Sequence, residues 1–235
     1  MAVRWAARAF NILRMHAMTA PKGFQTRSGN RAENVFEWIE LHSRETLWAI
    51  VAVTVVAGGI LFYQKSQAAQ MRNASVALDE AEQSINSGNL PLAQSSLDRL
   101  VKRYGDTPSG KVAVTLIAQV HYQKGEYQAG IDALKPLTTG DDKYFTAGAL
   151  NLAGNGYEQM KKYAEAADQY QKAASKAQYA SDKAFYLSSA ARVLLAAGKT
   201  ADAKAIWVQL SADPSGPGAA EARVRLGELE AKPVS

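Results

Sequence analysis

A glycine-centred turn returns along this chain at a nearly constant interval. The turn position falls at Gly88, Gly125, Lys161 and Gly198, with spacings of 37, 36 and 37 residues. This period is too short for a domain and is typical of stacked helical hairpins, because a single hairpin cannot bury its apolar side. A glycine in the left-handed conformation would end the first helix of each hairpin. The spacing therefore predicts an all-α solenoid over residues 65–217.

The third unit, residues 153–177 (AGNGYEQMKKYAEAADQYQKAASKA), has the most complete pattern of small and aromatic residues. It resembles a tetratricopeptide repeat. The resemblance implies antiparallel helices that approach closely at small residues, with a large ring filling the remaining space. Residues 218–231 (GAAEARVRLGELEA) predict a closing helix within the C-terminal segment 218–235. The positions that carry the resemblance are Gly154, Tyr157, Tyr163, Ala166, Tyr170 and Ala173.

A run of uncharged residues precedes the repeats. The 19 residues of segment 46–64 lie between Glu45 and Lys65, and Trp48 and Tyr63 mark their two ends. As a helix this run would extend roughly 28 Å, which is close to the hydrocarbon thickness of a bilayer. We therefore expect one N-terminal transmembrane helix over 46–64. A cleaved signal peptide and a buried soluble helix are the alternatives.

The distribution of charge predicts the orientation of this helix. Residues 1–45 contain seven basic and four acidic residues, whereas residues 66–235 contain 19 basic and 18 acidic residues. Short loops rich in Lys and Arg stay in the cytoplasm. We therefore expect a cytoplasmic N-terminus and an exported repeat domain. The large domain has no excess of positive charge, so we expect no nucleic acid as a partner.

The segment before the apolar run divides into two parts. Residues 1–32 are predicted to be a disordered basic tail. For residues 1–17 we favour a translation start at Met15 or Met18, with an interfacial helix or a transit peptide as alternatives. Residues 33–45 (ENVFEWIELHSRE) are predicted to form a short juxtamembrane helix with an acidic face.

Few residues suited to catalysis or metal binding are present. The chain has no Cys and only three His, which are far apart in sequence. We expect no metal, no cofactor and no enzymatic activity. The segment from Gly105 to Lys111 nearly matches a phosphate-binding loop, but Val112 replaces the Ser or Thr that would hold Mg²⁺. The simpler interpretation is that Gly105 ends one helix and Ser109 caps the next.

The expected functional surface is the concave face, which the first helices of the hairpins would line. Amide and aromatic side chains there suit an extended peptide, because amides pair with backbone N–H and C=O groups. A clamp for carboxylates would need several basic residues, and the repeat pattern supplies only one. The predicted partner groove consists of Gln119, Tyr122, Asn151, Asn155, Glu158, Ser188 and Arg192.

The order of these parts resembles the bacterial ancillary Sec-translocon subunits with a tetratricopeptide-like periplasmic domain. The similarity runs from about Asn34 to Ala231, through WIELHSRETLWAIVAVTVVAGGILFYQKSQ, YGDTPSGKVAVTLIAQVHYQKGEYQAGIDAL and the repeat turns. It implies a single-span protein of the bacterial inner membrane that lies beside the translocon channel. Such a protein would contact periplasmic chaperones or nascent polypeptides.

The sequence therefore predicts a membrane-tethered adaptor for protein–protein interaction. Two other functions stay open. One is a structural or assembly subunit of another membrane protein complex, and the other is a nucleotide-dependent enzyme that uses the Gly105–Lys111 segment. The second alternative requires that this segment form a phosphate-binding loop after a strand.

Overall fold

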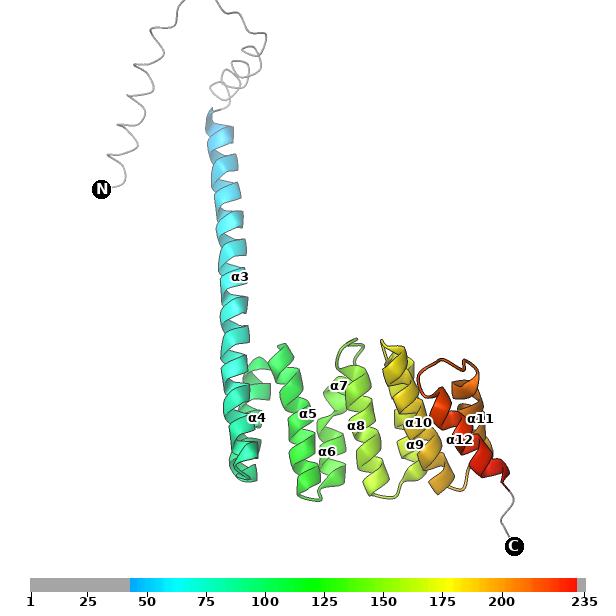
Figure 1. The fold of residues 1–235 in the computed structure, drawn as a ribbon. Helices are drawn as coiled ribbons and strands as arrows, with labels where there is room; N and C mark the ends of the chain where they lie inside the picture. Colours follow the sequence, from blue (N-terminus) through cyan, green and yellow to red (C-terminus); the bar gives the residue numbers. More distant parts are fainter. Residues whose placement is uncertain (1–42, 232–235) are drawn as a thin grey trace, which may run out of the picture. The chain divides into compact units, whose positions relative to one another are not determined.

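The computed structural model describes residues 43–231, and the side chains at 43–46, 49 and 50 are outside this description. The chain divides into two units, residues 1–63 and residues 64–235. The predicted tail over 1–32 and the predicted helix over 33–45, as far as residue 42, lie outside the described residues. Within residues 43–231 the regular elements are α-helices (Figure 1).

The first unit contains the N-terminal part of α3 (Ser43–Asn86). Large apolar side chains from Leu47 to Tyr63 are exposed there, with Trp48 72% and Phe62 76% accessible. Among the described residues, no helical segment combines the length and the apolar character needed to cross a membrane. The transmembrane helix predicted over 46–64 includes residues whose side chains are not described, and it stays a prediction.

The second unit is a series of helical hairpins (Figure 1). The C-terminal part of α3 packs with α4, α5 pairs with α6, α8 pairs with α9, and α10 pairs with α11, while the short α7 packs against α8. This series confirms the predicted all-α, tetratricopeptide-like solenoid. The bounds are α4 (Leu90–Tyr104), α5 (Pro108–Gln123), α6 (Tyr127–Ala133), α7 (Lys135–Thr138), α8 (Thr146–Gln159), α9 (Tyr163–Lys176), α10 (Ala180–Ala196), α11 (Thr200–Ser211) and α12 (Ala219–Glu230).

The turns inside the hairpins have the predicted left-handed conformation. The φ angles are 74° at Gly88, 78° at Gly125, 58° at Lys161 and 74° at Gly198. In each turn the next residue donates its N–H to the carbonyl five residues earlier, as from Lys162 to Tyr157 at 2.9 Å. This bond uses one of the free carbonyls at the helix end. The periodic turn is therefore confirmed as a property of the local backbone.

Lys161 is the one non-glycine residue with positive φ among the described residues, and this leads to a testable prediction. We expect Lys161→Gly to raise the free energy of unfolding by about 0.5–1 kcal/mol, because glycine avoids most of the cost of left-handed backbone. We expect Gly125→Lys to lower it by about 1 kcal/mol. Thermal unfolding followed by circular dichroism measures both. Lys162→Gly is the control, since φ is −84° there. Equal effects at 161 and 162 would contradict the prediction.

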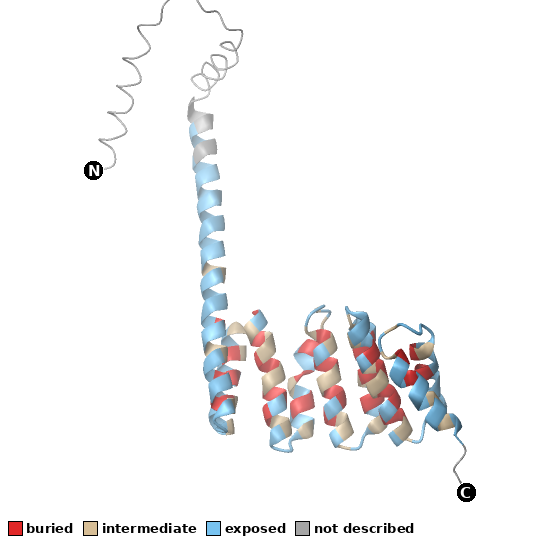
Figure 2. Ribbon diagram, in the orientation of Figure 1, coloured by how far each residue is buried: buried red, intermediate tan, exposed pale blue. Residues whose placement is uncertain are grey.

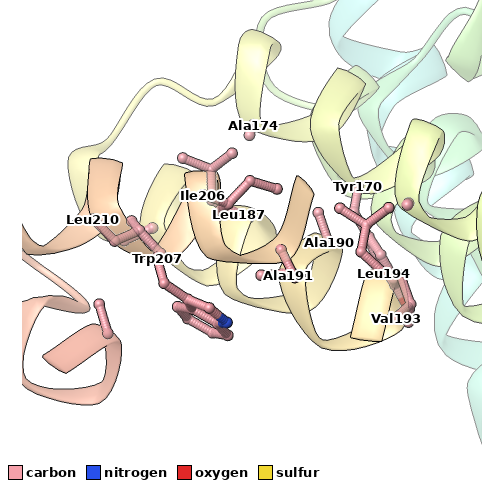
Figure 3. Packing of buried hydrophobic residues seen from close by; sticks show 14 of the residues in the cluster. Tyr170, Ala174, Leu187, Ala190, Ala191, Val193, Leu194, Ile206, Trp207 and Leu210 are labelled. Carbon is pink, nitrogen blue, oxygen red and sulfur yellow. The ribbon is translucent and has the colours of Figure 1, made fainter. Parts of the chain in front are cut away.

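Close approach of the paired helices depends on glycine and alanine. A Cβ atom added at Gly154 in α8 would lie 2.6 Å from the Tyr170 ring of α9, which confirms the predicted small-to-aromatic contact. In the preceding hairpin the roles are exchanged, because Gly130 of α6 lies against the Tyr122 ring of α5. Buried positions follow the helix faces that meet one another (Figure 2). The largest cluster of buried apolar side chains is formed by α9, α10, α11 and α12, and it contains Trp207 (Figure 3).

The segment from Gly105 to Lys111 joins two helices and does not have the strand–loop–helix form of a phosphate-binding loop. A Cβ added at Gly110 would lie 2.0 Å from the Tyr104 carbonyl oxygen, so this glycine permits tight packing of the connection. The Lys111 ammonium group lies 2.5 Å from Asp142 Oδ2. The helix cap is Thr107 and not Ser109 as expected, because Thr107 Oγ1 accepts the Gly110 N–H at 3.1 Å.

Candidate functional site

A hollow of about 560 Å³ opens on the first helices of three consecutive hairpins. Its walls come from α5, α8 and α10, with one residue from α6. It therefore lies on the surface for which the partner groove was predicted. The lining residues are Tyr122, Gln123, Tyr127, Leu152, Asn155, Glu158, Gln159 and Arg192.

Four of the seven predicted groove residues line this hollow, namely Tyr122, Asn155, Glu158 and Arg192. The other three do not. Gln119 is exposed outside it, and Asn151 is half-buried. Ser188 lies toward the end of the solenoid, where its hydroxyl would be 3.9 Å from a Cβ at Gly218. Ser188 therefore belongs to the surroundings of α12, and the role of all seven as partner contacts stays a prediction.

Four lining residues were not predicted from the sequence: Gln123, Tyr127, Leu152 and Gln159. Gln123 and Gln159 occupy the last turn of α5 and of α8, four residues after Gln119 and Asn155. A helix repeats its face every three or four residues, so the amide pattern contained this signal. Tyr127 is the first residue of α6, and its ring centroid lies 5.9 Å from that of Tyr122.

An ion pair crosses the hollow from one hairpin to the next. The two terminal nitrogens of Arg192 in α10 donate to Glu158 in α8, Nη1 to Oε1 and Nη2 to Oε2 at 2.9 Å. The buried Tyr170 hydroxyl lies 3.0 Å from Glu158 Oε2 and 2.5 Å from Asn155 Oδ1, and it donates to one of these oxygens. The carboxylate is thus contacted from two other helices, α9 and α10, and the bidentate geometry fixes the guanidinium in plane.

These contacts determine the charge of the hollow. Hydrogen bonding from Arg192, and then from Tyr170, lowers the pKa of Glu158 below its ordinary value. The same pair raises the pKa of Arg192. Arg192 was the single cation expected in the groove, and it is neutralised by Glu158. The hollow consequently presents amides and tyrosine rings without an unpaired charge among its lining residues.

The lowered pKa of Glu158 gives a prediction for the pH dependence of stability. Because the folded state favours the carboxylate, the pair stabilises the fold above the ordinary pKa of 4.5 and loses this effect as pH falls through the folded pKa. Arg192 is half exposed, so we expect at most about 1 kcal/mol. Urea titrations of Glu158→Gln should show a deficit at pH 7 that shrinks below pH 4.5. Glu165→Gln, at an exposed helix position, is the control; a pH-independent deficit would contradict the prediction.

Tyr122 forms one wall of the hollow and connects two hairpins. Its hydroxyl donates to the Leu152 carbonyl at 3.0 Å, and its ring lies against Gly130 and Gly156. Burial raises the pKa of this tyrosine, so it stays neutral and acts as a donor. The backbone of α6 and α8 therefore positions both the ring and the hydroxyl of this wall.

The side chains around the hollow are suited to hydrogen bonding and to apolar contact. Amides donate and accept hydrogen bonds, and tyrosine rings offer apolar area with little loss of conformational freedom. Within the part of the chain that the structure describes, no group of three or more His, Asp or Glu is placed to hold a metal ion. Such groups can pair with the backbone of an extended polypeptide.

Comparison with known proteins places the fold in a family. The family of tetratricopeptide repeat-like domains matches residues 37–209. No curated protein matches the chain in sequence. Among solved structures, TPR-like repeats attributed to a Podosopora anserina kinesin light chain superpose with a TM-score of 0.51 at 14% identity, over 66% of this chain and 83% of that one. BtubC (BKLC) from P. vanneervenii gives 0.50 at 14% identity, over 69% and 67%. These likenesses concern the fold alone.

Proposed function

This chain belongs to the tetratricopeptide repeat-like domain family, and on that premise we propose that it is an adaptor that binds a polypeptide segment in the hollow across α5, α8 and α10. One observation carries the proposal. The first helices of three consecutive hairpins line one open hollow, and the two charged residues that line it, Glu158 and Arg192, neutralise each other. An uncharged, extended segment would meet amide groups along its backbone and two tyrosine rings along its side chains.

Site-specific crosslinking tests this proposal. The full chain carries an affinity tag at Ser235 and a photoreactive residue at Gln159, which lines the hollow. The matched control has the photoreactive residue at Gln171, an exposed position of α9 outside the hollow. We expect a defined set of polypeptides from position 159 and none of them from position 171. Equal capture from both positions would exclude the hollow as the binding surface.

We further propose that the adaptor is tethered to the bacterial inner membrane through segment 46–64, with its repeats in the periplasm. The uncharged run and the exposed apolar side chains from Leu47 to Tyr63 support this proposal. Tethering raises the local concentration of the hollow near a membrane partner, so that weak contacts suffice. Membranes washed with alkaline carbonate should retain the full chain. Release of the chain into the supernatant would overturn the tether, whatever the hollow binds.

The partner that we propose is the Sec translocon channel, together with periplasmic chaperones or emerging polypeptides. Support for this step comes from the order of the parts along the chain. Mass spectrometry of the crosslinked products from position 159 provides the test. Peptides of translocon channel subunits would support the proposal. Enrichment of one unrelated membrane complex, without translocon peptides, would favour a structural or assembly subunit of that complex.

A further inference from the structure

A second hollow, of about 460 Å³, lies in the first hairpin, between the C-terminal part of α3 and α4. It shares no residue with the hollow across α5, α8 and α10. Its floor is apolar: Leu100 is buried, Ala77 is half-buried, and Val76 is 53% exposed. The exposed side chain of Val76 leaves apolar area in contact with water, which a partner would remove.

Two cations on α4 line the same hollow. Arg99 and Arg103 are one helical turn apart, so their side chains project from one face. Arg99 donates to Ser96 Oγ at 3.1 Å, and the Arg103 guanidinium lies 5.3 Å from the centre of the Tyr104 ring. Neither has a carboxylate within 4.0 Å among the described residues. The ion pairs that the structure describes all involve residues later in the chain, from Lys111 to Glu230.

The position of the hollow in the solenoid indicates the shape of its occupant. Each hairpin of the series packs against the helix that follows it, as α4 packs on α5 and α11 packs on α12. The α3–α4 hairpin is the first of the series, and none of the described helices covers its hollow. A groove between two antiparallel helices accepts a third helix through ridge-and-groove packing.

We propose that this hollow is a docking surface for an amphipathic helix of a partner protein. The apolar side of that helix rests on Val76 and Leu100, and two of its carboxylates, one turn apart, pair with Arg99 and Arg103. A protein helix fits better than a lipid headgroup, because the lining includes the carboxylate of Glu80 and the apolar floor lies between two helices. The surface is separate from the polypeptide-binding hollow, so one adaptor would hold two partners at once.

Peptide binding to the full chain in detergent micelles tests the docking surface. The probe is a fluorescent 18-residue peptide with leucines along one helical face and glutamates one turn apart beside them; its counterpart has lysine in place of glutamate. We expect the acidic peptide to bind at least about tenfold more tightly. Arg99→Glu with Arg103→Glu should weaken that binding by at least about tenfold. Lys199→Glu with Arg223→Glu makes the same change in net charge at exposed positions elsewhere and should leave binding unchanged.

Further variants make the test specific for this hollow. Val76→Ser should weaken binding of the acidic peptide, whereas Val208→Ser, at an equally exposed valine of α11, should not. Gln123→Ala with Gln159→Ala alters the other hollow and should leave this binding intact. The proposal is overturned if Gln123→Ala with Gln159→Ala abolishes binding of the acidic peptide. It is also overturned if the Arg99/Arg103 and Lys199/Arg223 charge reversals weaken that binding equally.

Other occupants would be recognised by their own signatures. Binding of anionic phosphatidylglycerol vesicles that is lost in Arg99→Glu with Arg103→Glu, without binding of the acidic peptide, would overturn the helix in favour of a lipid surface. A dimer in sedimentation that is lost in the same variant, again without peptide binding, would overturn it in favour of a second copy. Binding of the acidic peptide by the wild-type chain and the control variants, with loss in Arg99→Glu with Arg103→Glu, supports the proposed helix.

Discussion

Replacing Trp207 by alanine is expected to lower the free energy of unfolding by about 3–5 kcal/mol. Trp207 is 1% exposed and is the largest fully buried side chain of the described residues. Its ring lies in the cluster that α9, α10 and α11 form with Ala222 of α12 (Figure 3). Removing the indole leaves a cavity that the surrounding alanines are too short to fill, so contact energy is lost as well as apolar burial.

Two further substitutions make the Trp207 prediction specific. Val208→Ala, at the next and exposed position, should change the free energy of unfolding by less than about 0.5 kcal/mol. Trp207→Phe should cost less than the alanine variant, because the indole N–H has no hydrogen-bond partner among the described residues and its loss offsets part of the lost burial. Chemical denaturation measures all three. A loss below about 1 kcal/mol in Trp207→Ala would mean that α12 does not close this cluster.

The second large effect is expected at Gly154, where an added methyl group should be destabilising by about 1–3 kcal/mol or more. The new Cβ would lie 2.6 Å and 2.8 Å from two ring atoms of Tyr170, whose side chain is fully buried. Gly148, in the same helix, has no atom within 4 Å of an added Cβ. Gly148→Ala should therefore stabilise the fold by about 0.5–1 kcal/mol, as expected for alanine in a helix.

The Gly154 variant should also disturb the proposed binding surface. The Tyr170 hydroxyl lies against Asn155 and Glu158, so a displaced ring moves two groups that line the hollow. Tyr170→Leu in the background of Gly154→Ala should recover part of the lost stability, because the two sites share one contact. Thermal unfolding of the four combinations measures this coupling. If Gly154→Ala and Gly148→Ala shift stability in the same direction, the close packing of α8 on α9 is wrong.

Much of the fold follows from local signals. The four turns were predicted from glycine and its spacing, and all four have positive φ, including Lys161, which was placed by the period and not by its residue type. The closing helix predicted over 218–231 corresponds to α12 (Ala219–Glu230). The predicted cap of α5, Ser109, was wrong by two residues, because the cap is Thr107. Thr107 and Ser109 both have a hydroxyl, and the start of the helix at Pro108 decides between them.

The candidate site was less accessible from sequence. The repeat pattern selects one side of the first helix of each hairpin, and four of the seven residues chosen in this way line the hollow. It did not reveal that Glu158 neutralises Arg192, because these residues are 34 positions apart and meet only when adjacent hairpins pack. It also did not indicate the hollow at Arg99 and Arg103. That surface depends on the absence of a covering helix among the described residues.

The sequence by itself determined the helical hairpins, their period and their left-handed turns, because these features depend on backbone conformation within a few residues of each glycine. The tertiary structure alone decided which side chains meet. The rotation of one hairpin on the next is fixed by close contacts such as Gly156 of α8 with Tyr122 of α5 and by the filling of space around Trp207. Those contacts place Glu158 beside Arg192 and leave Arg99 and Arg103 without a carboxylate partner among the described residues, and no period in the sequence encodes them.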